Sequence, residues 1–358
     1  MMKTDNRKIN FGAGPATLPI EVLQLAANAV LDFDGRGISI LELPHRGKEF
    51  NAIIEESKLI VRELCQLDDN YEVLWLQGGG RQQFCMVPMN FLDQNGTAGY
   101  VDSGHWSSEA MKYAGHYGNA AVIASSKNTG YNRLPNLPDV LPKGLAYIHF
   151  TTNNTIYGTQ LQDIPLSGSP LVADMSSDIF SCNRDHSKYD LFYAAAQKNI
   201  GIAGIGLVVL RREMLEKQVR TLPPMFDYKE NVRENSVLNT ANVFGIYTSL
   251  LMLRWIKSKG IDNIEKENIA KAALLYNAID NNSSFLPYVN EKSHRSNMNV
   301  CFNARNIEIE NRFLQLCREQ NITGVKGHRL VGGFRVSLYN AITLDSVKIL
   351  TQIINSIS

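Results

Sequence analysis

The segment Ala194-Ala195-Ala196-Gln197-Lys198-Asn199-Ile200-Gly201 carries the most informative pattern in the chain. Its alanines end a short apolar run, and Lys198 follows them directly before a turn that contains glycine. Burial lowers the pKa of an amine from its usual value of about 10.4, and a neutral amine is a nucleophile. Lys198 is therefore either a reactive amine at the end of a buried strand or an ordinary surface lysine.

An acidic residue precedes this lysine by 24 positions, at the end of Pro170-Leu171-Val172-Ala173-Asp174. An acid at the carboxyl end of a central strand lies at the ligand-binding edge of an open sheet. Asp174 could there contact a ribose, a metal, or the protonated ring nitrogen of pyridoxal phosphate (PLP). The alternative is a helix N-cap, because two serines follow at 176–177.

A glycine-rich loop, Gln77-Gly78-Gly79-Gly80-Arg81, lies between a β-rich run and a helical pattern. Glycines let a phosphate approach the free N–H groups of a helix N-terminus, and Arg81 could add a charge-assisted contact. The alternative is a tight turn that needs positive φ. The loop is neither a Walker loop nor a GxGxxG, so neither ATP nor NAD is favoured.

The chain order of these three features is more informative than any one of them. A phosphate loop, then an acid, then a lysine is the layout of a fold-type I PLP enzyme. The interval between Asp174 and Lys198 also suits two neighbouring strands of one sheet.

The remaining sequence predicts an α/β protein. Apolar runs without polar alternation indicate a buried, mostly parallel sheet. These runs cover residues 98–101, 120–124, 146–150, 171–174, 191–195 and 207–210. After about Thr248 the pattern changes to long helices with two further strands, which indicates a smaller α+β domain.

Composition excludes several classes of protein. Among 358 residues, 36 Lys and Arg face 35 Asp and Glu, so the net charge of +1 does not suggest a nucleic-acid or polybasic membrane surface. No apolar run approaches the ~20 residues that span a bilayer. Five widely spaced cysteines without a CxxC argue against disulfides and structural zinc. The N-terminus is polar. From these features together we expect a cytoplasmic enzyme without a metal.

Motifs spread over nearly the whole chain resemble the phosphoserine aminotransferase family of class-V PLP-dependent aminotransferases. The most specific are HRGKEF at 45–50, QKNIG at 197–201 and GHRLVGG at 327–333, in that order. The shorter matches lie at 11–15, 78–81, 104–106, 154–156, 173–174 and 239–240.

The resemblance implies roles around the cofactor ring. Lys198 would form the Schiff base with PLP and carry the proton between Cα and C4′. Asp174 would pair with the pyridinium nitrogen and keep the ring an electron sink. Trp106 would stack on the ring face, and Thr155 would contact the region of the ring hydroxyl.

The cofactor phosphate would be held from two subunits. The resemblance assigns Gly80, Arg81 and Gln197 to it from one chain. Asn239 and Thr240 would reach it from the other subunit, which implies a homodimer with shared active sites.

The same resemblance implies an anionic substrate pocket. Arg46 and Arg335 would bind substrate carboxylates. His45, His328 and Arg329 would form a cradle for the substrate phosphate. Guanidinium groups match carboxylate and phosphate bidentately, so one cationic pocket can serve glutamate and phosphoserine.

The implied activity is transamination between L-glutamate and 3-phosphohydroxypyruvate, giving 2-oxoglutarate and O-phospho-L-serine, a step of serine biosynthesis (EC 2.6.1.52). The same activity on a phosphorylated hydroxythreonine precursor would serve pyridoxine biosynthesis. Alternatives are another class-V activity, such as alanine–glyoxylate transamination, and a non-catalytic PLP-binding protein. A desulfurase needs a cysteine in a mobile loop, whereas Cys301 and Cys317 fall in an expected strand and helix.

The resemblance further implies a large PLP-binding domain of residues 16–255 with a mostly parallel seven-stranded sheet. Residues 1–15 and 256–358 would form the small domain. Some positions depart from the family pattern without touching the lysine, the acid or the arginines. They are Ala13, Gln82, Tyr157 and Ile202.

Overall fold

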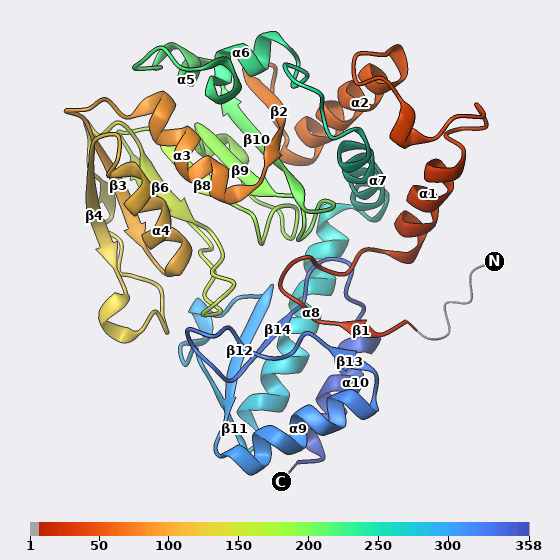
Figure 1. Cartoon of the computed structure of the whole chain (residues 1–358). Coiled ribbons are helices and arrows are strands. Elements are labelled where there is room, and N and C mark those ends of the chain that lie inside the picture. Colours follow the sequence, from red (N-terminus) through yellow and green to blue (C-terminus); the bar gives the residue numbers. More distant parts are fainter. Residues whose placement is uncertain (1–6, 358) are drawn as a thin grey trace.

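The structure is a computed structural model that describes residues 7–357. Its centre is a seven-stranded sheet of order β2-β10-β9-β8-β6-β3-β4 (Figure 1). The strands are β2 (Tyr71–Gly78), β3 (Thr97–Asp102), β4 (Asn119–Ser125), β6 (Ile148–Thr151), β8 (Leu171–Asp174), β9 (Leu191–Ala195) and β10 (Gly204–Arg211). Only β10 runs antiparallel to its neighbours within this sheet. The predicted α/β fold with a mostly parallel seven-stranded sheet is confirmed.

Helices cover both faces of this sheet, which explains why its strands lack polar alternation. In β9, Phe192 packs into the cluster formed with one set of helices, and Tyr193 packs into the cluster on the opposite face. The first set is α1 (Ile20–Leu31), α2 (Lys48–Cys65) and α7 (Val243–Lys259). The second set is α3 (Gly80–Phe91), α4 (His105–Ala114), α5 (Arg212–Glu216) and α6 (Tyr228–Arg233).

The parallel strands bring their carboxyl ends to one edge of the sheet. Asp174 at the end of β8 is in register with Thr151 of β6 and with Tyr193 of β9. The turn that carries Lys198 begins directly after β9. Chain segments that are distant in sequence therefore meet at the edge where open α/β sheets bind their ligands.

A second core lies below the sheet in Figure 1. Its antiparallel sheet contains β11 (Phe285–Pro287), β12 (Asn299–Ala304) and β14 (Phe334–Ser337). The helices α8 (Ile261–Asp280), α9 (Ile307–Glu319) and α10 (Leu344–Asn355) contribute to the same core. Two short strands, β1 (Ile9–Asn10) and β13 (Ile322–Thr323), pair in parallel and so join the N-terminal segment to this part of the chain. A further small sheet pairs β5 (Val140–Leu141) with β7 (Leu166–Ser167).

Aromatic packing holds this second core together. The rings of Phe313 and Phe334 lie 4.5 Å apart between centroids, and Phe285 and Phe302 meet edge to face at 5.7 Å. Such pairs add stability of about 0.5–1.5 kcal/mol beyond the burial of their area. This packing fixes β14, which also carries Arg335.

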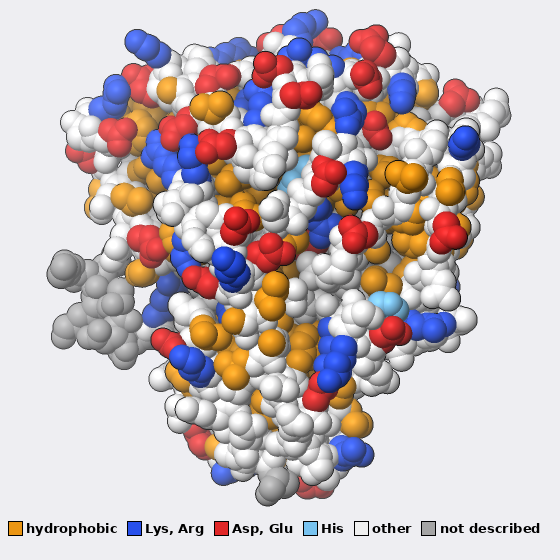
Figure 2. Space-filling view, turned by 180° about the vertical axis from the view of Figure 1, so that it is seen from behind, with side chains coloured by type: hydrophobic (Ala, Val, Ile, Leu, Met, Phe, Trp, Pro, Cys, Tyr) orange, Lys and Arg blue, Asp and Glu red, His pale blue; other side chains and the backbone are white. Residues whose placement is uncertain are grey.

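The surface carries charges of both signs. Figure 2 shows Lys and Arg side chains interspersed with Asp and Glu over the back of the molecule, in keeping with the net charge of +1. Within residues 7–357, no helix combines the length and the apolar character needed to cross a membrane.

Candidate active site

Asp174 ends β8 as a buried carboxylate with 6% exposure. Its Oδ1 accepts a hydrogen bond from the backbone N–H of Ser176 at 2.9 Å. Burial raises the pKa of Asp174, while the charge of Lys198 and the contacts from Ser176 oppose that rise. The structure thus brings together the acid and the lysine that the sequence singled out.

Lys198 lies half-buried in the turn after β9. Burial lowers the pKa of its amine to about 8, and Arg335 acts in the same direction against the opposing charge of Asp174. A substantial fraction of this amine is neutral at physiological pH, which suits a nucleophile and a proton-transfer group.

The glycine loop forms a cradle against the segment that carries Asp174. Gly80 is the first residue of α3, and a Cβ placed on it would come within 2.9 Å of the Ser176 Oγ. That hydroxyl is itself fixed, since it accepts the N–H of Ala195 at 3.0 Å. Only a glycine leaves this space open beside the free N–H groups of the helix.

Gln197 supplies a second sign of a ligand. Among residues 7–357, its buried Oε1 has no hydrogen-bond partner. A buried amide without a partner is costly unless a ligand completes its hydrogen bonds. Rotation of the terminal amide by half a turn would direct its N–H₂ donors at an anion. The glycine cradle and this amide therefore fit the phosphate of PLP.

Trp106, Thr155 and Arg335 form a continuous contact across the two cores. The Trp106 Nε1 donates to the Thr155 Oγ1 at 3.0 Å, and the Arg335 Nη1 donates to the Thr155 carbonyl oxygen at 3.2 Å. The Arg81 guanidinium lies 5.6 Å from the centre of the Trp106 ring. The ring-stacking candidate and one substrate arginine are thus neighbours.

The turn at 327–333 brings His328 and Arg329 to the same side of the molecule. The His328 Nδ1 accepts the N–H of Leu330 at 3.3 Å, and Arg329 is exposed. Burial lowers the pKa of His328, and Arg335, His105 and Arg329 lower it further. The Gly327 N–H donates to the Gly333 carbonyl oxygen at 2.8 Å, which closes this turn at the start of β14, the strand of Arg335.

Four predicted site residues lie on two segments that contact one another. The Arg46 Nη2 lies 3.4 Å and 3.5 Å from the carbonyl oxygens of Leu238 and Val237, just before Asn239 and Thr240. His45 is on the same loop as Arg46. The Gln77 Nε2 of the glycine-rich loop donates to the Thr240 carbonyl oxygen at 2.6 Å.

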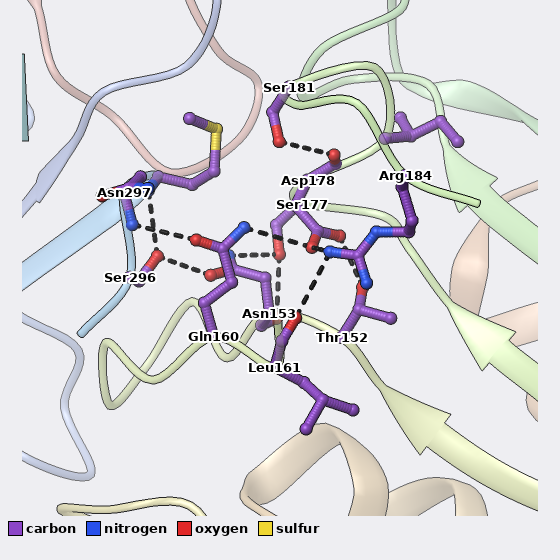
Figure 3. A network of polar contacts seen from close by, with 12 residues as sticks. Thr152, Asn153, Gln160, Leu161, Ser177, Asp178, Ser181, Arg184, Ser296 and Asn297 are labelled. Carbon is purple, nitrogen blue, oxygen red and sulfur yellow. Dashed lines mark hydrogen bonds and ion pairs between the residues drawn. The ribbon is translucent and has the colours of Figure 1, made fainter. Parts of the chain in front are cut away.

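A buried polar network around Asp178 was not predicted from the sequence (Figure 3). The fully buried Asp178 carboxylate pairs with Arg184 at 2.9 Å and accepts a hydrogen bond from the Thr152 Oγ1 at 2.5 Å. The Gln160 Nε2 lies 3.3 Å from the same carboxylate. The buried ion pair of Asp178 and Arg184 has further hydrogen-bond partners, so it holds the loop that follows Asp174 in one conformation.

Asn153 connects this network to the second core. Its Nδ2 donates to the Ser177 Oγ at 2.8 Å and to the Asn299 Oδ1 at 2.7 Å. Its Oδ1 accepts from the Ser296 Oγ at 2.5 Å. The signal that could have revealed it is the polar run at 151–155, which follows directly on a buried strand.

The departures from the family pattern occupy unrelated environments. The Ala13 carbonyl accepts the Tyr339 hydroxyl at 2.9 Å. The Tyr157 ring lies 4.9 Å from that of Tyr131. Gln82 folds back over Gly78, and Ile202 packs against the core of the large sheet.

Comparisons with known proteins agree with this geometry. The phosphoserine aminotransferase of Flavobacterium psychrophilum is 46% identical over 353 residues, which is 98% of this chain and 99% of that protein. The structure of phosphoserine aminotransferase from Bacillus circulans subsp. alkalophilus superposes with a TM-score of 0.94 at 39% identity, covering 98% of both chains. A PLP-bound phosphoserine aminotransferase from Trichomonas vaginalis gives 0.89 at 31% identity, covering 97% of this chain and 99% of that one.

These structures confirm the fold-type I architecture. The class-V aminotransferase family matches residues 9–350, a range that includes the glycine cradle, the acid, the lysine and the cationic turn. The chain belongs to the class-V aminotransferase family of PLP-dependent enzymes.

Proposed function

We propose that this protein transfers the amino group of L-glutamate to 3-phosphohydroxypyruvate, giving 2-oxoglutarate and O-phospho-L-serine. This is the phosphoserine transaminase reaction of serine biosynthesis, EC 2.6.1.52. One structural observation carries the proposal: Asp174 and the turn of Lys198 lie at one edge of the sheet, where Arg335 donates to the Thr155 carbonyl oxygen. Full-length identity of 46% to a phosphoserine aminotransferase supports the choice of substrates.

The residues around the sheet edge fit PLP, which when bound withdraws electrons from the bonds at the amino-acid Cα. Asp174 would pair with its ring nitrogen, and Trp106 and Thr155 would contact the ring. Gly80, Arg81 and Gln197 would hold its phosphate. These assignments rest on the glycine cradle, the unpartnered Gln197 amide and the buried position of the acid.

Lys198 has the properties of the proton-transfer group. With a pKa of about 8, its Nζ can take a proton from the substrate Cα and return one at physiological pH. The Asp174 carboxylate would balance the positive charge of the ring nitrogen when PLP is bound. Proton transfer is thus proposed for Lys198 and charge balance for Asp174. The two groups differ in environment, because Lys198 has a pKa near neutrality and Asp174 is a buried carboxylate.

We assign substrate binding to Arg335, His328 and Arg329. Arg335 reaches the site from β14 and is anchored by the Thr155 carbonyl, so its guanidinium fork is oriented for the α-carboxylate. His328 and Arg329, on the neighbouring turn, would meet the anion at the far end of the substrate. That anion is a carboxylate in glutamate and a phosphate in phosphoserine.

We propose that His45, Arg46, Asn239 and Thr240 complete the site of a second copy, which implies a homodimer with shared sites. The contact of Arg46 with the carbonyl oxygens just before Asn239 holds these two segments together. Hybrid dimers test this. Lys198→Ala and Arg46→Ala subunits, each weak or inactive alone, should regain activity when mixed, since one site of each hybrid is intact.

Random mixing should restore roughly a quarter of the wild-type sites, because half of the dimers are hybrids with one intact site each. Steady-state assays after unfolding and refolding of the mixture measure the gain. Mixing Lys198→Ala subunits with Lys198→Arg subunits is the control and should restore nothing. No gain in the first mixture would contradict shared sites.

We also propose two features of organisation. The large domain would span residues 16–255, and residues 1–15 and 256–358 would form the small domain, of which residues 1–6 lie outside the described residues. The proposed junction after residue 255 lies inside α7, and Gly260 separates α7 from α8. Five free cysteines, three of them buried, favour a reducing cytoplasmic location, which cell fractionation would check.

The absorption spectrum of the purified protein tests the function. We expect a visible band from bound PLP that O-phospho-L-serine converts and L-alanine leaves unchanged, because alanine has no second anion for the cationic turn. A stronger response to alanine would favour the alanine–glyoxylate type of activity. No band after addition of PLP would contradict the cofactor assignment.

A further inference from the structure

His105, to which the 104–106 motif gave no role, lies beside the turn at 327–333. It is the first residue of α4, and its half-buried ring lies 4.9 Å from the ring centre of Trp106. The ring of His328 lies 6.4 Å away, at an interplanar angle of 35°. Two imidazoles from the two cores therefore face one another next to the residue proposed to stack on the cofactor.

Positive charge around these rings exceeds negative charge. The nearby carboxylate, Glu109, is engaged by Lys112 at 2.6 Å and lies 3.8 Å from Arg81. Arg329 and Arg335 form no ion pair within residues 7–357. An excess of unpaired cations in a site that binds small anions indicates that the missing negative charge comes from the substrate.

The two amino-acid substrates differ in that negative charge. A phosphate monoester carries about −1.5 to −2 at pH 7 and has three strong acceptor oxygens, whereas a carboxylate carries one charge on two oxygens. Preference for the phosphate therefore needs donors beyond those that satisfy a carboxylate. We propose that His105 donates a hydrogen bond to the substrate phosphate and helps the enzyme to prefer it over the glutamate side chain, an inference that rests on the proposed function.

The protonation of the two rings couples this contact to pH. Burial lowers the pKa of His105 and of His328, and the surrounding cations add to the effect. The charged groups that face them are Arg81 on α3, Glu109 and Lys112 on α4, Arg329 on the turn and Arg335 on β14. Of these, Glu109 alone opposes the shift of His105.

The rings are therefore largely neutral in the free protein at neutral pH. A phosphate dianion between them raises their pKa, so its binding takes up a proton. Affinity for phosphoserine should then fall as pH rises above about 6, where the phosphate is already a dianion. Affinity for glutamate, which lacks this second charge, should fall less over the same range.

Substitution of His105 in the holoenzyme tests the proposal. His105→Ala should lower kcat/KM for O-phospho-L-serine by roughly 10- to 30-fold, as for loss of a hydrogen bond to a charged group. The value for L-glutamate should change less than about 3-fold. His116→Ala, an exposed histidine just beyond the other end of α4, is the matched control and should change neither value.

His105→Asn separates the hydrogen bond to the phosphate from the charge of the ring, because asparagine keeps a side-chain N–H but cannot be protonated. It should retain part of the phosphoserine preference and flatten the pH dependence. Equal losses for both substrates would overturn the proposal, since His105 would then act through Trp106 on the cofactor. An unchanged substrate ratio in His105→Ala would overturn it too. Failure of the wild-type enzyme to use phosphoserine would instead contradict the proposed function.

Discussion

Replacement of Lys198 by alanine should lower the transamination rate by at least about 10⁴-fold, the upper range for loss of a positioned acid–base group. In the proposed function the amine serves both as the nucleophile toward the cofactor and as the proton carrier at the substrate Cα, so its loss removes both roles at once. Lys198→Arg should be equally inactive, because its charge remains while its nucleophilicity is lost. Rates with glutamate and with phosphoserine measure the effect.

Lys188→Ala is the matched control, since this exposed lysine precedes the opposite end of β9. It should leave the rate unchanged. The pH dependence adds a second check. Uptake of PLP by cofactor-free wild-type protein should accelerate as pH rises through about 8, because the neutral amine is the reactive form. Retained turnover in Lys198→Ala would show that another residue carries the chemistry.

Replacement of Asp174 by asparagine should lower kcat by roughly 10²–10⁴-fold and weaken retention of PLP. The carboxylate would keep the ring nitrogen of PLP protonated, and a neutral amide could not balance that charge. Asp174→Glu should recover part of the rate, since it restores the charge at a displaced position. Assays of kcat at saturating PLP, together with PLP release after dilution, measure the two effects separately.

The same substitution should not destabilise the cofactor-free protein. Burial raises the pKa of Asp174, which means that the buried carboxylate costs folding free energy once ionised. A group with a raised pKa favours the folded state at low pH and loses that advantage as pH increases. Asp174→Asn should therefore unfold at a temperature equal to or above that of the wild type at neutral pH.

Asp163→Asn, an exposed acid on a loop, controls for the change in net charge. Thermal unfolding of the cofactor-free proteins at pH 5 and pH 8 makes the comparison. Near-normal turnover in Asp174→Asn would mean that another group pairs with the ring nitrogen. A large loss of stability without PLP would mean that the acid has a structural role.

Most of the fold could be predicted because its signals are local. Apolar runs without alternation report strands that are covered on both faces, as Phe192 and Tyr193 show by packing into opposite clusters. The glycine loop, the acid and the lysine each stand directly after such a run. Parallel strands carry whatever follows them to the same edge of the sheet, so chain order was sufficient to place Asp174 and Lys198 together.

The residues that the sequence did not reveal depend on long-range packing. Asn153 donates a hydrogen bond to Asn299 across a sequence separation of 146 residues. No local sequence pattern at either position predicts that the two side chains meet. His105 is significant only because the turn at 327–333 sets His328 opposite it. His45 and Arg46 belong to a clear sequence motif, yet the sequence does not show that their loop meets the segment just before Asn239.

Sequence alone thus determined the class of enzyme and predicted the reactive lysine, its acid and the phosphate loop, since short-range spacing and strand order define them. The tertiary structure decided how the two cores are joined through buried amides and which candidate side chains contact one another. Those outcomes follow from side-chain packing between segments that are far apart in the chain. The identity of one residue does not specify which distant residue it will contact.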